Sequence, residues 1–229
     1  MRTYDPNHPL IVIHIPKTAG MTTERFYKRW FKDGFLRHYY IPSEDKMPEK
    51  FDLFGMHSKE KPIVLHGHFN KLRNFGIADY YPKADQFITI LRDPFEQMVS
   101  TYFFVKKVGI NWKDKSRIPK GELRDFLFSR KPNMLNHFPK DVTMYNYKDI
   151  IETFFIEIGI TEHLEKSMKR IARKLNFDYY PELLTKRLNA TERDQYVPYE
   201  LKEEFKEKNK QEYAVYNYAL GKLISEDSE

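Results

Sequence analysis

One short segment near the start of the chain constrains the fold more than any other: LIVIHIPKTAGMTT, residues 10–23. Its apolar part, residues 10–15, predicts a buried strand, which is followed by a tight loop at residues 16–20 and an amphipathic stretch that begins near Thr22. A loop between a strand and a helix directs backbone N–H groups and the positive end of the helix dipole toward one point. The segment therefore predicts an anion site, and a phosphate is its natural ligand.

The side chains of this loop favour the same interpretation. Lys17 supplies a mobile positive charge, and three threonines supply hydroxyl groups. A Walker A loop has its lysine after a second glycine, whereas Lys17 directly follows the strand, so the loop is of another kind. The alternative is an ordinary strand–turn–helix unit with an exposed lysine. The residues expected to contact the phosphate are Lys17, Thr18, Ala19, Gly20, Thr22 and Thr23.

A second candidate segment is His66-Gly67-His68, which follows a predicted buried strand at residues 63–65. One interpretation is a metal site, but no third ligand has motif spacing, so we expect no metal. Another is a pair of structural histidines that caps a strand. The third is catalytic, because imidazole is the commonest general base near neutral pH.

A third candidate segment, QFITILRDPFEQMVSTYFF, predicts a strand at residues 86–92 and a helix at residues 95–107. Asp93 suits the N-cap of that helix, and Pro94 suits its first turn. Arg92 can direct two donors at a phosphate, and Ser100 lies about two helical turns into the helix. The alternative is a strand–helix junction with a surface arginine.

The remaining chain continues the alternation of strands and helices. We expect helices at residues 24–35 and 123–128, and a strand at 154–160. Thr161 is expected to cap a helix at residues 162–175, and a long helix is expected from residue 197 to about 224. Residues 36–61 predict a loop with a short strand or helix, and much of 108–147 predicts variable loops that suit an acceptor site.

This alternation predicts an α/β fold of one domain, residues 1–229, with a mainly parallel sheet flanked by helices. Ligands of such sheets bind beyond the carboxyl ends of the strands. Lys17, the HGH segment and Arg92 all follow predicted strand ends. We therefore expect them to converge on one cleft.

Taken in this order, HIPKTAG, VLHGHFNKLRNFG and RDP with Ser100 resemble the sulfotransferases that use 3′-phosphoadenosine 5′-phosphosulfate (PAPS). The similarity is greatest to the carbohydrate branch with the heparan sulfate 2-O- and 6-O-sulfotransferases and their bacterial relatives. The resemblance implies a P-loop-like three-layer fold, PAPS as sulfuryl donor, 3′-phosphoadenosine 5′-phosphate (PAP) as product, and a hydroxyl acceptor, most simply a glycan. Met21 stands where this branch usually has threonine, and Gln97 where many relatives have arginine.

The resemblance also implies roles for individual residues. His68 would be the base, with His66 as a supporting or alternative base. Lys17 would stabilise the leaving phosphate, while Arg92 and Ser100 would hold the 3′-phosphate. A polar loop at residues 184–193 would close over the adenosine, although a solvated basic loop explains it nearly as well. Its candidate residues are Lys186, Arg187, Asn189 and Thr191.

Composition narrows the function further. The chain has no cysteine, which excludes disulfides, thiol catalysis and cysteine-bound metal, and is typical of a reducing compartment. Without an apolar run of membrane-spanning length or a signal peptide, we expect a cytoplasmic protein. A net charge of +6 favours an anionic partner, but no basic block indicates nucleic acid. Two rivals remain: a P-loop-type nucleotide phosphotransferase and a non-catalytic polyanion-binding module.

Overall fold

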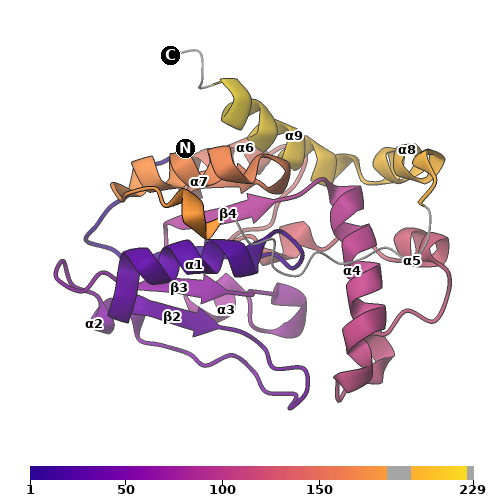
Figure 1. Ribbon diagram of the computed structural model, residues 1–229, viewed down its shortest axis with the longest axis horizontal. Helices are drawn as coiled ribbons and strands as arrows, with labels where there is room; N and C mark the ends of the chain where they lie inside the picture. Colours follow the sequence, from indigo (N-terminus) through magenta and orange to yellow (C-terminus); the bar gives the residue numbers. More distant parts are fainter. Residues whose placement is uncertain (185–196, 226–229) are drawn as a thin grey trace.

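The computed structural model describes residues 1–184 and 197–225, and its centre is a sheet of five parallel strands in the order β2-β3-β1-β4-β5 (Figure 1). The expectation of a mainly parallel sheet is confirmed. In Figure 1 the arrowheads of β2, β3 and β4 point toward α4. The strands are β1 Leu10–Ile13, β2 Phe35–His38, β3 Val64–Gly67, β4 Phe87–Leu91 and β5 Phe155–Ile160.

Helices cover both faces of the sheet and form the two outer layers. Side chains alternate along a strand, so Leu10 and Val12 of β1 pack with α1 and α7, while Ile11 and Ile13 pack with α6 and α9 on the other face. The helices are α1 Gly20–Phe31, α2 Leu53–Met56, α3 Ile77–Tyr80, α4 Pro94–Val108, α5 Leu123–Ser129, α6 Tyr147–Phe154, α7 Leu164–Leu175, α8 Tyr199–Lys208 and α9 Lys210–Ser225.

The structure differs from the sequence prediction at several helix boundaries. Helix α1 begins at Gly20 and ends at Phe31, where residues 24–35 were expected, and Phe35 begins β2. Thr161 does not cap α7, because its hydroxyl donates to the Leu91 carbonyl of β4 at 2.9 Å and the chain makes a short 3₁₀ turn before Leu164. The long C-terminal helix is two helices, which separate at Asn209. The Asn209 side-chain amide donates to the Phe205 carbonyl at 2.7 Å, so this residue ends α8.

The order of the strands brings the three candidate segments together. β1 lies between β3 and β4, with Ile13 opposite Gly67 on one side and Thr89 on the other. The loop after β1 therefore lies between the HGH segment and the end of β4, which Arg92 follows directly. The chain crosses from β3 over β1 to reach β4, and such a crossing is where ligands of open α/β sheets bind.

Candidate active site

The loop after β1 has a backbone conformation suited to an anion. Lys17 has φ of 69° and Ala19 has φ of 62°, both in the left-handed region, whereas Thr18 and Gly20 do not have positive φ. Alternation of left- and right-handed residues directs successive N–H groups into one concavity. The loop leads directly into α1, whose first turn contributes further N–H groups and the positive dipole end.

Side chains of Arg92 after β4, of Gln97 in α4 and of Thr18 in the loop itself donate to carbonyl oxygens of this loop. One guanidinium nitrogen of Arg92 donates to the Lys17 carbonyl at 3.3 Å, and the Gln97 side-chain amide donates to the Pro16 carbonyl at 3.0 Å. The Thr18 hydroxyl donates to the Ile15 carbonyl at 2.8 Å. Gln97, which the sequence presented only as a missing arginine, is therefore a buried anchor for the loop.

Lys17 lies in a partly buried setting beside α4. Its ammonium nitrogen lies 4.1 Å from the centre of the Phe104 ring, which supports the charge through a cation–π contact. Burial, followed by the positive charge of Arg92, lowers the pKa of Lys17 to about 8. The ammonium group thus remains charged at neutral pH but lies closer to its titration point than an exposed lysine does.

The threonines among the predicted phosphate contacts differ in their hydrogen bonds. Thr23 uses both its donors inside the first turn of α1, with its N–H on the Ala19 carbonyl at 3.1 Å and its hydroxyl on the Gly20 carbonyl at 3.1 Å. The hydroxyl groups of Thr18 and Thr23 thus donate to nearby carbonyls, as short hydroxyls readily do, and their expected contact with a phosphate stays a prediction. Thr22 is nearly buried in that turn.

Ser100 lies on α4 and is 7% exposed. It occupies the face of α4 that also carries Gln97 and Phe104, since residues three and four apart in a helix share a face. Both neighbours contact the loop or its lysine. Ser100 therefore lies on the face of α4 that adjoins the loop, and its contact with a 3′-phosphate stays a prediction.

The HGH segment contributes one accessible and one inaccessible imidazole. His68 Nδ1 lies 2.5 Å from the His14 carbonyl oxygen, so it carries the ring proton and donates it. His68 remains partly exposed, whereas His66 is 0% exposed. The ring of His66 is buried within β3, so it is less accessible than that of His68, and its expected role as a supporting or alternative base stays a prediction.

Burial keeps these imidazoles neutral. It lowers the pKa of His68 to about 4, although the hydrogen bond to His14 acts in the opposite direction. Burial and then the neighbouring His68 ring lower the pKa of His66 to about 3. A neutral His68 with its proton on Nδ1 has a free electron pair on Nε2, which is the form that a general base needs.

The structure adds residues that the sequence prediction missed. His14 directly precedes the loop, and its ring centre lies 4.5 Å from that of His68. The Tyr39 hydroxyl lies 2.9 Å from His14 Nδ1 and 2.8 Å from His66 Nδ1. The buried ring of His137 lies 6.3 Å from that of His68. The position of His14 at the end of a predicted strand was a usable signal, but nothing in the sequence linked Tyr39 or His137 to it.

In the described parts of the chain, no group of three or more His, Asp and Glu side chains is arranged to hold a metal ion. None of the described helices combines the length and apolarity that crossing a membrane requires. The predicted contacts Lys186, Arg187, Asn189 and Thr191 lie outside the described residues.

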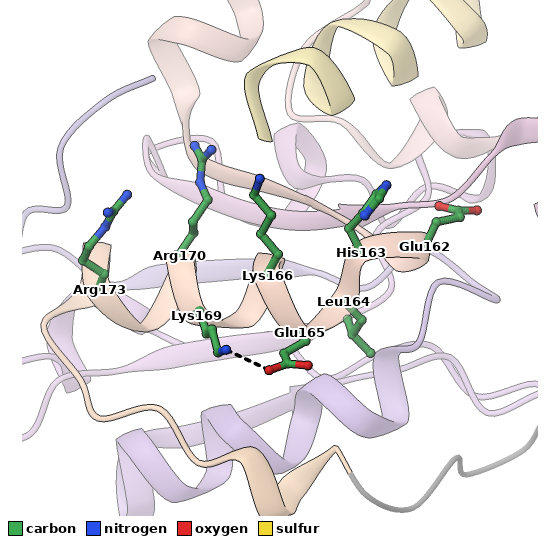
Figure 2. Close-up of a pocket in the computed structure, with 8 residues that line it drawn as sticks. All are labelled: Glu162, His163, Leu164, Glu165, Lys166, Lys169, Arg170 and Arg173. Atoms are coloured by element: carbon green, nitrogen blue, oxygen red, sulfur yellow. Dashed lines mark ion pairs between the residues drawn. The ribbon is translucent and has the colours of Figure 1, made fainter. Parts of the chain in front are cut away.

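An open groove of about 610 Å³ runs along α7, and neither His14, His66 nor His68 lines it. Figure 2 shows that Lys166 and Arg170 point to one side of α7, and Lys169 and Glu165 to the other. Lys169 pairs with Glu165 at 2.8 Å, and Arg170 pairs with the buried Glu157 at 2.9 Å. These two cations are thus already engaged within the protein. The residues that line the groove are Glu162, His163, Leu164, Glu165, Lys166, Lys169, Arg170 and Arg173.

Two solved structures are similar to this chain. The crystal structure of mouse sulfotransferase SULT7A1 complexed with PAP is 13% identical, with a TM-score of 0.47; the match covers 79% of this chain and only 63% of the mouse chain. A sulfotransferase from Alicyclobacillus acidocaldarius is 13% identical with a TM-score of 0.50, and the match covers 93% of this chain and 94% of that one. The second likeness shows a shared fold, which confirms the expected P-loop-like α/β architecture.

No sequence among curated proteins matches the chain. The model of the Sulfotransferase family, however, matches residues 2–219. This match spans the loop at Lys17, the HGH segment, and Arg92 with Ser100. The protein therefore belongs to the sulfotransferase family.

Proposed function

We propose that the protein transfers a sulfuryl group from PAPS to a hydroxyl group of an acceptor, and that the acceptor is a carbohydrate. One observation carries the proposal. The His14 carbonyl at the start of the loop accepts the Nδ1 proton of His68 at 2.5 Å, so the anion-binding loop and the base are joined directly. Family membership supports the reaction type. The resemblance to the heparan sulfate enzymes supports the choice of a glycan.

Donor binding is assigned to the loop and to α4. In this proposal, Lys17 and the N–H groups around Ala19 and Gly20 bind the 5′-phosphosulfate. Arg92 and Ser100 hold the 3′-phosphate and so fix the position of PAPS. The contact of Arg92 with the Lys17 carbonyl supports this assignment, because it places the guanidinium directly beside the loop that would bind the 5′-phosphosulfate. The hydroxyl groups of Thr18 and Thr23 bond carbonyls of the loop and of the first turn of α1. The donor contacts of Thr22, Lys186, Arg187, Asn189 and Thr191 stay predictions.

Transfer proceeds in line at sulfur. The acceptor oxygen attacks the sulfur atom while His68 Nε2 takes the hydroxyl proton, and the bond from sulfur to the 5′-phosphate oxygen breaks. Lys17 and the loop N–H groups stabilise the negative charge that grows on the leaving phosphate. Positioning and electrostatic stabilisation supply most of the rate, as in phosphoryl transfer. A cytoplasmic location remains part of the proposal, on the ground that the sequence has no cysteine.

Calorimetric titration with PAP, ADP and ATP tests the proposal. We expect micromolar binding of PAP without a divalent cation and much weaker binding of ADP, because only PAP carries the 3′-phosphate that Arg92 and Ser100 would hold. ATP binding that is strongest and depends on magnesium would favour a phosphotransferase instead. If none of the three nucleotides binds, and heparin binds with a steep dependence on salt, a polyanion-binding module would be favoured instead.

A further inference from the structure

We propose, on the basis of the proposed sulfuryl transfer, that His14 presents its Nε2–H as a fixed hydrogen-bond donor between the phosphate-binding loop and the base. Its ring lies at the junction of the two. A Cβ atom added to Gly20 would lie 1.8 Å from His14 Nε2, so the ring edge rests directly on the first residue of α1. The His14 ring also contacts His68, and the centres of these two rings lie 4.5 Å apart.

The Tyr39 hydroxyl fixes the protonation of this ring. It lies within hydrogen-bond distance of Nδ1 on both His14 and His66, at 2.9 and 2.8 Å. Burial and the neighbouring imidazoles hold the pKa of both histidines well below the ordinary value, so each ring carries one proton. Among the described residues, the Tyr39 hydroxyl has hydrogen-bond contacts with these two nitrogens only, so it donates its one proton to one imidazole and accepts from the other.

Two observations decide the direction of the two hydrogen bonds that join His66, Tyr39 and His14. Glu24 Oε2 lies 3.9 Å from His66 Nδ1, and a nearby carboxylate favours a proton on that nitrogen. His66 Nε2 is buried and has no hydrogen-bond partner among the described residues. A buried N–H without a partner is rarer than an under-satisfied acceptor, so the proton of His66 belongs on Nδ1. Tyr39 therefore accepts from His66 and donates to His14 Nδ1, which leaves the proton of His14 on Nε2.

An N–H donor at this point acts on the sulfuryl group as it moves from the loop to the acceptor. The bond between sulfur and the 5′-phosphate oxygen breaks, the bond to the acceptor oxygen forms, and His68 takes the acceptor proton. His14 keeps its proton throughout and only donates a hydrogen bond to an oxygen that gains negative charge. Donors aimed at developing charge accelerate a reaction more than they tighten ground-state binding.

The first test reads the tautomers in the wild-type protein. Long-range ¹⁵N–¹H spectra of histidine-labelled protein distinguish protonated from bare ring nitrogens, and His14→Gln identifies the His14 signals by their loss. We expect a proton on Nε2 of His14 and on Nδ1 of His66. In Tyr39→Phe the preference of His14 for a proton on Nε2 should disappear. The control is Tyr40→Phe, which should retain this preference, because the hydroxyl of the neighbouring Tyr40 bonds Asp45 instead. A proton on His14 Nδ1 in the wild type overturns the proposal.

The second test follows loss of sulfate from PAPS to water beside calorimetric PAP binding. His14→Ala and Tyr39→Phe should slow sulfate release about tenfold or more, with PAP affinity within about twofold. His14→Gln should recover much of the rate, because its amide N–H reaches the place of imidazole Nε2–H. Equal rates of sulfate release in Tyr39→Phe and Tyr40→Phe overturn the proposal. A loss of PAP affinity as large as the loss of rate in His14→Ala or Tyr39→Phe also overturns it. A wild type that neither binds PAP nor consumes PAPS instead overturns the proposed function, while the tautomers still decide the assignment of His14.

Discussion

At the scale of single residues, burial acts on the two central groups in ways that suit opposite tasks. It lowers the pKa of Lys17 only to about 8, so the ammonium stays charged at neutral pH. It lowers the pKa of His68 to about 4, so the imidazole stays neutral. One site therefore offers a cation for a leaving anion and a base for a hydroxyl at the same pH.

The pKa of Lys17 predicts how PAP affinity depends on pH. Lys17 is protonated below about pH 8 and loses its charge as the pH rises through that value, so the attraction for PAP should weaken there. Calorimetric titrations from about pH 7 to about pH 9 measure this fall. In Lys17→Arg the charge persists, so the affinity should stay nearly constant over this range. A wild-type affinity that does not change with pH would contradict the assignment of Lys17.

Removal of the proposed base should separate turnover from binding. His68→Ala should lower turnover about 10²–10⁴-fold, the usual contribution of a general base. PAP affinity should change little, because Lys17, Arg92 and the loop remain. The partly exposed His8, which lies outside the proposed site, supplies a control, and His8→Ala should leave both quantities unchanged. Wild-type turnover in His68→Ala would remove this residue from the mechanism.

At the scale of elements, the start of α4 supports the loop that is proposed to bind the sulfuryl donor. Its N-cap Asp93 accepts from the Glu96 N–H at 3.1 Å and pairs with Lys202 of α8 at 3.0 Å. Arg92, which precedes this cap, and Gln97, one turn into the helix, both hold carbonyls of the loop. The start of α4 and the shape of the loop are therefore coupled.

Substitution of the cap should reveal this coupling. Asp93→Ala should lower the free energy of unfolding by about 1 kcal/mol, the typical contribution of an N-cap, and should also weaken PAP binding because Arg92 loses its fixed position. Chemical denaturation and calorimetry measure the two effects. Asp52 caps the short helix α2 through the Gly55 N–H at 3.1 Å. Asp52→Ala should therefore affect stability alone, and equal PAP affinity in both variants would refute the coupling.

At the scale of the whole molecule, a buried ionic cluster joins β5, α7 and α9. Glu157 of β5 is 0% exposed and contacts Arg170 of α7 at 2.9 Å and Lys174 at 3.0 Å. Arg170 also donates to the Lys222 carbonyl of α9 at 2.8 Å. Such clusters add little net stability when complete, but loss of one partner leaves a buried charge uncompensated.

This cluster should be sensitive to loss of its carboxylate. Glu157→Gln should lower the free energy of unfolding by about 3 kcal/mol or more, because the guanidinium of Arg170 stays buried without that charge. Urea denaturation measures the change. The control is Glu165→Gln, which removes an exposed ion pair with Lys169 on the same helix and should cost less than about 1 kcal/mol. Similar losses of unfolding free energy in Glu157→Gln and Glu165→Gln would show that burial of the ion pair does not decide how much stability its loss costs.

Local patterns in the sequence were sufficient for most elements of the sheet. Four of the five strands were predicted from apolar runs, and the cap at Asp93 was predicted from Asp-Pro after a strand. β2 was not assigned, because Phe35–His38 is partly exposed and shows no continuous apolar run. The break at Asn209 was missed because helical periodicity continues through it on both sides.

The sequence by itself determined the class of fold and the chemistry of the loop, because strand burial, helix capping and phosphate binding depend on residues close together in the chain. Only the tertiary structure decided how exposed and how oriented the two histidines of the HGH segment are. They lie two residues apart in the sequence, yet β3 buries His66 while the His14 carbonyl orients the partly exposed His68. The bridge from Tyr39 to His14 and His66 likewise depends on parallel strands whose ends meet although they are distant in sequence.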